Sequence, residues 1–162
     1  MQYTPDDLQV HLIHRILQGY DGIFCAGTGY GKSLVFEGLG GKGKLVIIIS
    51  PLEALERDQV RLLAILVIWS CTDIFPGRAS QIDALFINED TTKTANLWKH
   101  ARTSAAMVYM LPEMALCPRF QNLWKDSRFR TRLTVIVVDE SHCIAERGGE
   151  DFRVAYRLLE TL

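Results

Sequence analysis

The chain has 162 residues, of which 48% are hydrophobic and 23% are charged. This composition predicts one soluble globular domain, or a fragment of a larger protein. The formal net charge of −1 does not indicate a polybasic nucleic-acid binder, although it leaves a local basic patch open. The four cysteines include no CxxC pair, which argues against a zinc module or a disulfide scaffold and favours reduced, buried thiols. The longest apolar run, residues 62–69, is too short for a bilayer, which takes about 20 residues, and the N-terminus lacks a secretory signal.

The first half of the chain alternates helical patterns with short apolar runs. We expect helices over residues 9–18, 32–39 and 51–63, and strands over residues 22–26 and 44–50. The run at 44–50 is continuously apolar and β-branched, which is typical of a strand buried on both faces of a parallel sheet. Pro51 is well placed in the first turn of the helix that follows.

The second half continues the alternation. We expect strands over residues 84–88, 105–111 and 133–140, and helices over residues 91–103 and 112–124. Residues 64–84 fit neither pattern well and are a candidate insertion. Strands that alternate with helices predict right-handed crossovers and an α/β fold, with a mostly parallel sheet and helices on both faces.

Residues 26–33 read AGTGYGKS and follow an expected strand. Glycines let successive backbone N–H groups approach phosphates closely, and the following helix contributes its positive end. Lys32 can reach the β- and γ-phosphates, and the Ser33 hydroxyl can bind Mg²⁺. An incidental glycine-rich turn is the alternative, but the position between strand and helix favours a phosphate loop.

Asp139 and Glu140 end the clearest expected strand. Ligands of a parallel sheet bind at the carboxyl ends of its strands, which is also where the glycine loop is expected. We therefore assign Asp139 to Mg²⁺ and Glu140 to the attacking water. A solvated acidic pair at the end of a strand is the alternative.

Three segments in order, AGTGYGKS, SPLEALERDQV and VVDESHCIAERGGEDFR, resemble the first RecA-like domain of RecQ-type DNA helicases. The box Asp139-Glu140-Ser141-His142 matches the DExH signature of that family, and the similarity runs over nearly the whole chain. The resemblance implies a RecA-like P-loop NTPase domain over residues 1–162. It further implies ATP-dependent 3′-to-5′ unwinding of DNA with Mg²⁺, and a second RecA-like domain in cis.

The resemblance also implies roles for individual residues. Gln9 would bind adenine, with a surface residue as the alternative. The other nucleotide-binding residues would be Thr28, Gly29, Gly31, Lys32 and Ser33. The metal would be held by Ser33 and Asp139, and catalysis would depend on Glu140, Asp139 and Lys32. DNA contact or coupling would fall to His142, Ser50, Phe152 and Arg153. The alternatives are a core histidine at His142, a strand cap at Ser50 and a core side chain at Phe152. The charged cluster at 125–132 is expected to be a solvated face rather than a phosphate contact.

The chain departs from the family pattern at several places. Arg147 stands where the family has a tryptophan, and Leu111 replaces a serine before Pro112. The stretch 64–78 is longer than the family needs, either as an insertion or as a gene-model fault. Because the sequence ends soon after the DExH box, we expect a fragment or truncated form that binds ATP weakly, hydrolyses it slowly and unwinds nothing.

Two other functions stay open. The first is a degenerate, non-catalytic module that binds nucleotide or DNA, and the second is a P-loop ATPase without a nucleic-acid role. The location is expected to be intracellular, in the nucleus if the source is eukaryotic and otherwise in the cytoplasm, with no membrane partner.

Overall fold

The computed structural model describes residues 5–27, 29–40, 43–50, 83–89, 95–139, 141 and 154–159. The expected helix at 51–63 and nearly all of the candidate insertion at 64–84 lie outside the described residues. The same holds for six residues singled out above, namely Thr28, Glu140, His142, Arg147, Phe152 and Arg153.

Four strands form one parallel sheet at the centre of the fold. They are β1 (Leu45–Ile49), β2 (Ala84–Ile87), β3 (Met107–Met110) and β4 (Leu133–Val138), in the order β2-β3-β1-β4. Every residue of β1 is buried, as expected for a central strand that packs on both faces. The predicted α/β class with a parallel sheet is confirmed.

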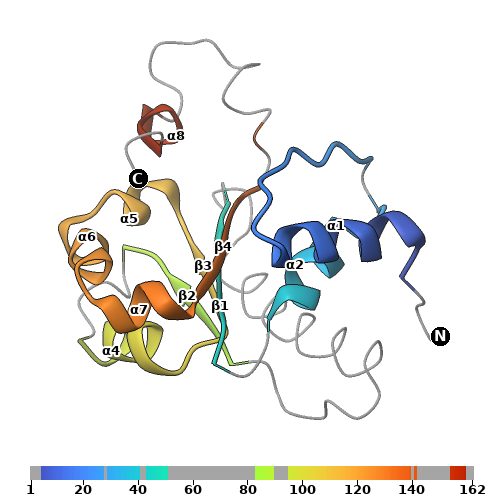
Figure 1. Ribbon diagram of the computed structural model, residues 1–162. Helices are drawn as coiled ribbons and strands as arrows, with labels where there is room; N and C mark the ends of the chain where they lie inside the picture. The colour runs from blue at the N-terminus through green and yellow to red at the C-terminus, as the bar shows by residue number, and fades with distance from the viewer. Residues whose placement is uncertain are drawn as a thin grey trace.

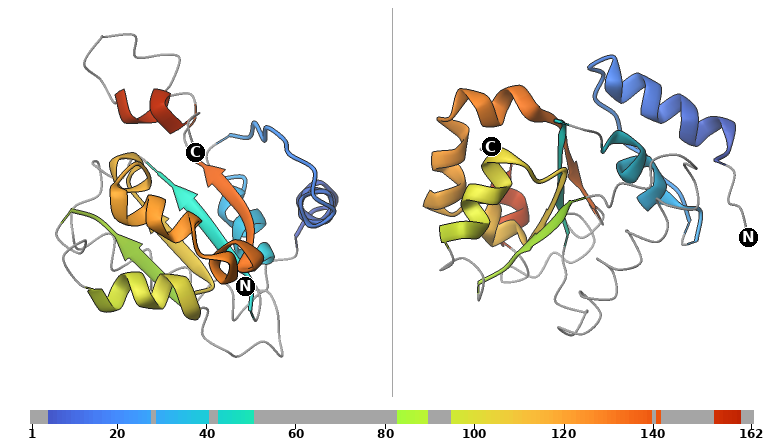
Figure 2. Two further views of the ribbon diagram at one scale, coloured as in Figure 1. Left: turned by 60° about the vertical axis from the view of Figure 1, so that its left-hand side comes forward. Right: turned by 90° about the horizontal axis from the view of Figure 1, so that it is seen from below.

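Helices cover both faces of this sheet, as Figures 1 and 2 show. One face carries α1 (Asp7–Leu17) and α2 (Lys32–Leu39), and the other carries α4 (Ala95–Thr103), α5 (Pro112–Ala115), α6 (Pro118–Trp124) and α7 (Ser127–Arg132). A further short helix, α8 (Val154–Leu158), lies near the carboxyl end of the described chain. No helix among the described residues is long and apolar enough to span a bilayer.

Alternate residues of β1 point into two separate apolar cores. Leu45, Ile47 and Ile49 belong to the core under α4 to α7, whereas Val46 and Ile48 belong to the core that α1 and α2 cover. This division follows from the two-residue period of a strand. The central strand therefore joins the two helical layers.

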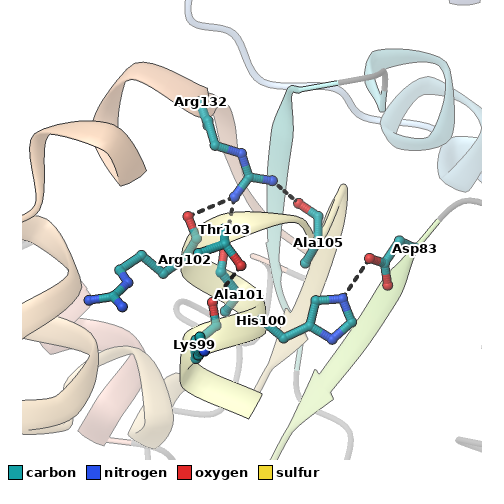
Figure 3. Close-up of polar contacts among 8 residues, drawn as sticks. All are labelled: Asp83, Lys99, His100, Ala101, Arg102, Thr103, Ala105 and Arg132. Carbon is teal, nitrogen blue, oxygen red and sulfur yellow. Dashed lines mark hydrogen bonds and ion pairs between the residues drawn. The ribbon is translucent and has the colours of Figure 1, made fainter. Parts of the chain in front are cut away.

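Polar contacts close the end of α4 against its neighbours (Figure 3). The Arg132 guanidinium donates to the carbonyls of Ala101 at 3.3 Å and Arg102 at 2.8 Å, and also to the carbonyl of Ala105. Partial burial lowers the pKa of Arg132, an effect that the negative charge of Asp83 opposes. Before β2, Asp83 Oδ2 lies 2.6 Å from His100 Nε2 of α4. Within the charged cluster at 125–132, residues 127–132 form α7, and Arg132 at least has a structural partner.

The strand expected at residues 22–26 is wrong. Residues 21–27 form no strand, Ile23 is 89% exposed, and the thiol of Cys25 is exposed rather than buried. Strand pairing needs a neighbouring backbone at about 4.8 Å. Among the described residues β4 pairs with β1 alone. Residues 22–26 do not pair with β4, and both segments line the same cavity instead.

The single helix expected at residues 112–124 is also wrong, because it is divided into α5 and α6. Pro118 has no N–H to donate and disfavours helical backbone at the residue before it. Cys117 accordingly has extended backbone, with φ −70° and ψ 150°, and its sulfur accepts the N–H of Phe120 as the N-cap of α6.

Candidate nucleotide-binding site

The glycine loop makes a tight turn between residue 27 and the start of α2. Gly29 and Gly31 have φ angles of 84° and 86°, a left-handed backbone conformation that residues with a Cβ rarely adopt. The Tyr30 N–H donates to the Gly27 carbonyl at 3.3 Å, which closes the turn. A residue other than glycine at either position would strain the backbone of the loop.

Lys32 is the first residue of α2, and its side chain folds back over the loop. Its Nζ donates to the carbonyl of Ala26 at 3.0 Å and to that of Gly27 at 3.3 Å. Ser33 follows in the first turn of α2 and is exposed. The helix N-terminus, an ammonium group and a hydroxyl are thereby gathered at one place, which suits the binding of anionic phosphates.

Asp139 stands directly after β4, where two backbone contacts fix it. Its N–H donates to the Ile49 carbonyl at the end of β1 at 2.8 Å, and its carbonyl accepts the hydroxyl of Tyr156 at 3.2 Å. Tyr156 belongs to α8 and is 2% exposed. The backbone of Asp139 is therefore held at the carboxyl edge of the sheet by an adjacent strand and by a later helix.

One cavity of about 780 Å³ joins the two halves of the site. Its lining includes Ala26 and Lys32 from the glycine loop and Asp139 and Ser141 from the end of β4. The two segments thus meet at one rim, which is the arrangement that the sequence argument requires.

The residues at this cavity are compatible with Mg²⁺. Mg²⁺ takes oxygen ligands and in nucleotide sites is usually held by one or two carboxylates together with substrate phosphates. Asp139 lines the cavity and has a carboxylate of that type. Ser33, the other predicted metal ligand, has a hydroxyl in the first turn of α2 but is not among the residues that line the cavity. Among the described residues, no group of three or more His, Cys, Asp or Glu forms a dedicated metal cage.

Gln9 is fully buried, and its side-chain amide contacts the glycine loop. Its Nε2 donates to the carbonyls of Tyr30 at 2.9 Å and Gly31 at 3.4 Å, and its Oε1 accepts the N–H of Asp6 at 3.0 Å. The surface alternative for this residue is therefore excluded. Sequence reasoning missed this connection between α1 and the loop, because neither the capping pattern nor the loop motif predicts which residues they meet.

Ser50 and Leu111 lie at the same sheet edge as Asp139. Ser50 follows β1, and its N–H donates to the Met110 carbonyl of β3 at 3.2 Å. Leu111 is the N-cap of α5 and makes no capping hydrogen bond through its side chain, which packs against the apolar core instead. A serine at this position would supply the missing acceptor.

An α/β domain with a parallel sheet, in which a glycine loop and a strand-end aspartate line one cavity, has the fold of a P-loop NTPase domain. The family model described as DEAD/DEAH box helicase matches residues 6–162, and the chain belongs to that family. The resemblance to RecQ-type helicases is confirmed by relatives that match nearly all of the chain.

Three relatives illustrate the match. The ATP-dependent DNA helicase Q5 of Rattus norvegicus is 32% identical over 98% of this chain and 15% of its own length. The bifunctional 3′-5′ exonuclease/ATP-dependent helicase WRN of Mus musculus is 33% identical over 96% of the chain and 10% of its own length. The ATP-dependent DNA helicase RecQ of a Synechocystis strain is 29% identical over 95% of the chain and 30% of its own length. The chain thus spans less than a third of these relatives.

Proposed function

We propose that this chain is the ATP-binding domain of an ATP-dependent 3′-to-5′ DNA helicase of RecQ type, and that it binds Mg-ATP and DNA. The observation that carries the proposal is the shared cavity, which Lys32 and Asp139 both line. The relatives are named as ATP-dependent DNA helicases, which supports DNA as the second ligand.

Each residue of the site has a defined part in the proposed reaction. The loop around Gly29 and Gly31 presents backbone N–H groups to the phosphates, and Lys32 exchanges its loop carbonyls for the β- and γ-phosphate oxygens. Asp139 and Ser33 would hold the metal, which would neutralise charge on the phosphates when bound. Glu140 orients the attacking water, and Gln9 is assigned to adenine.

Turnover is proposed to require a second RecA-like domain in cis. A cationic side chain from such a domain stabilises the transition state and raises the rate of phosphoryl transfer by about 10³- to 10⁵-fold. The 162-residue chain alone should therefore bind ATP weakly and hydrolyse it slowly. DNA contact is assigned to Ser50, His142, Phe152 and Arg153. We further propose an intracellular location, nuclear in a eukaryote, since the exposed free thiol of Cys25 suits a reducing compartment.

The test measures binding of a fluorescent ATP analogue with Mg²⁺ to the chain and to its Lys32→Ala variant. The loss of a charged hydrogen-bond donor should weaken binding by about tenfold or more. Lys99→Ala is the matched control, because it removes the same charge from an exposed position on α4, across the sheet from the loop. Equal binding by the parent and Lys32→Ala would refute the phosphate-loop assignment.

A second arm adds single-stranded DNA to the same titration. A change in analogue affinity with DNA supports a nucleic-acid-coupled domain. The non-catalytic module that binds nucleotide alone is favoured if DNA has no effect. DNA-stimulated hydrolysis at a helicase-like rate by residues 1–162 would contradict the need for a second domain.

A further inference from the structure

Tyr30 carries the one bulky side chain between the two left-handed glycines of the loop. Its ring packs edge to face against Phe24, with ring centroids 5.7 Å apart and an interplanar angle of 65°. Phe24 is half-buried and lines the same cavity as Lys32 and Asp139. The ring of Tyr30 thus ties the crest of the loop to the segment that leads into it.

The backbone of Tyr30 is tied to a second element, the start of α1. Its carbonyl accepts Gln9 Nε2 at 2.9 Å. The same glutamine forms a capping box with Asp6, since Gln9 N donates to Asp6 Oδ1 at 2.9 Å and Asp6 N donates to Gln9 Oε1 at 3.0 Å. The start of α1 and the glycine loop are therefore joined in one hydrogen-bond network.

The hydroxyl of Tyr30 makes the third connection, a hydrogen bond to the side chain of Asp6. This bond is the main reason that the pKa of Asp6 lies below its ordinary value, and the N–H of Gln9 adds to the effect. Asp6 is therefore ionised at neutral pH and accepts both bonds as a carboxylate. Tyr30 therefore contacts Phe24 through its ring, Gln9 through its carbonyl and Asp6 through its hydroxyl.

We propose that Asp6 and Tyr30 are positioning residues for the phosphate loop, holding it in the conformation that receives a triphosphate. Glycines at residues 29 and 31 leave the loop many other conformations, and a loop that is only partly in the competent one binds with proportionally lower affinity. The inference rests on the proposed nucleotide site but assigns residues outside its phosphate contacts.

The test uses Tyr30→Phe, which keeps the ring contact with Phe24 and removes only the hydroxyl, and Asp6→Asn, which keeps a good N-cap for α1. Each should weaken binding of the fluorescent ATP analogue by about 3- to 10-fold, the range for one hydrogen bond. Inorganic tripolyphosphate, which has no base or sugar, should lose the same factor as a competitor. The double variant should bind the analogue no more weakly than the weaker-binding of the two single variants, because both changes remove the same hydrogen bond between Tyr30 and Asp6.

Asp7→Asn is the matched control. Asp7 is the adjacent exposed carboxylate in the first turn of α1, and its replacement changes the charge without touching Tyr30. This variant should bind like the parent. Circular dichroism melting curves for all variants should show that each is folded at the assay temperature.

The outcomes separate this inference from the proposed function. If Lys32→Ala loses affinity while Tyr30→Phe and Asp6→Asn do not, the nucleotide site stands and the positioning pair is overturned. Independent, additive losses from the two variants also overturn the pair, as does a loss for the ATP analogue that tripolyphosphate does not share. If the parent and Lys32→Ala bind equally, it is the proposed function itself that fails.

Discussion

The contact between Gly38 of α2 and Ile13 of α1 sets the distance between the two helices that carry the nucleotide site. A Cβ built on Gly38 would lie 2.6 Å from Ile13 Cδ1 and 3.4 Å from Ile13 Cγ1. The first distance is well inside ordinary van der Waals contact, whereas the second is acceptable. Gly38→Ala therefore tests whether α1 packs on α2 as the structure shows.

Two effects oppose each other in this variant. Alanine in place of glycine within a helix stabilises it by about 1 kcal/mol. Overpacking costs about 1–3 kcal/mol, here toward the lower end because Cδ1 is the tip of a flexible side chain. We expect Gly38→Ala to lower the free energy of unfolding by about 0–2 kcal/mol.

The sign should reverse when the obstructing methyl group is removed. Ile13→Val deletes Cδ1, at a cost of about 0.5–1.5 kcal/mol by itself. In that background Gly38→Ala should stabilise the protein by up to about 1 kcal/mol. The coupling energy of this double-mutant cycle should thus be favourable and about 1–3 kcal/mol.

Urea denaturation followed by circular dichroism measures all four proteins, and the midpoints are compared at constant m-value. The packing described here would be refuted if Gly38→Ala stabilised the chain by the same amount in both backgrounds. Gly38 would then have no close neighbour on α1. The packing of α1 on α2, which places Gln9 against the glycine loop, would be contradicted.

Three further predictions concern the rest of the fold. Arg132→Met should lower the free energy of unfolding by about 1–3 kcal/mol in urea denaturation, since backbone carbonyls at the end of α4 lose a charged donor. As the control, Arg128→Met at an exposed position should change it by less than about 0.5 kcal/mol. Thr134→Val should stabilise the chain by about 1 kcal/mol in urea denaturation, because Thr134 Oγ1 is buried and has no hydrogen-bond partner in the described part of the chain. A loss of stability would show that the hydroxyl is satisfied. The lowered pKa of Asp6 contributes stability that is present above about pH 4 and is lost as the pH falls through the folded-state pKa of Asp6. Asp6→Asn should therefore flatten the acid side of a curve of unfolding free energy against pH. An unchanged acid side would contradict the hydrogen bond between Tyr30 and Asp6.

The sheet could be predicted from the sequence because burial on both faces leaves a simple pattern. The runs at 44–50, 84–88, 105–111 and 133–140 each contain one of the observed strands. The helix that begins at Lys32 was predicted with the observed bounds, since the glycine loop before it and the glycines after it limit its length. Local signals were sufficient at these places.

The errors arose where a distant or weak partner decides the structure. Residues 22–26 have the composition of a strand but no neighbouring strand among the described residues, and composition alone cannot supply one. Helix α7 was missed because half of its residues are arginines and only one of its residues, Phe129, is buried. Asp126 before it, whose side chain caps the helix, was the local signal that could have revealed it.

The position of the nucleotide loop follows from the same observation about residues 22–26. Because this segment does not join the sheet, hydrogen bonds to β4 do not set the place of the loop relative to Asp139. The loop is held instead by α2, which it opens, and by Gln9 and Asp6 at the start of α1. Asp139, in contrast, is fixed by the sheet through Ile49 and by α8 through Tyr156. The two halves of the site therefore depend on different parts of the core, and changes in the packing of α1 on α2 should alter the phosphate-binding half while leaving the aspartate in place.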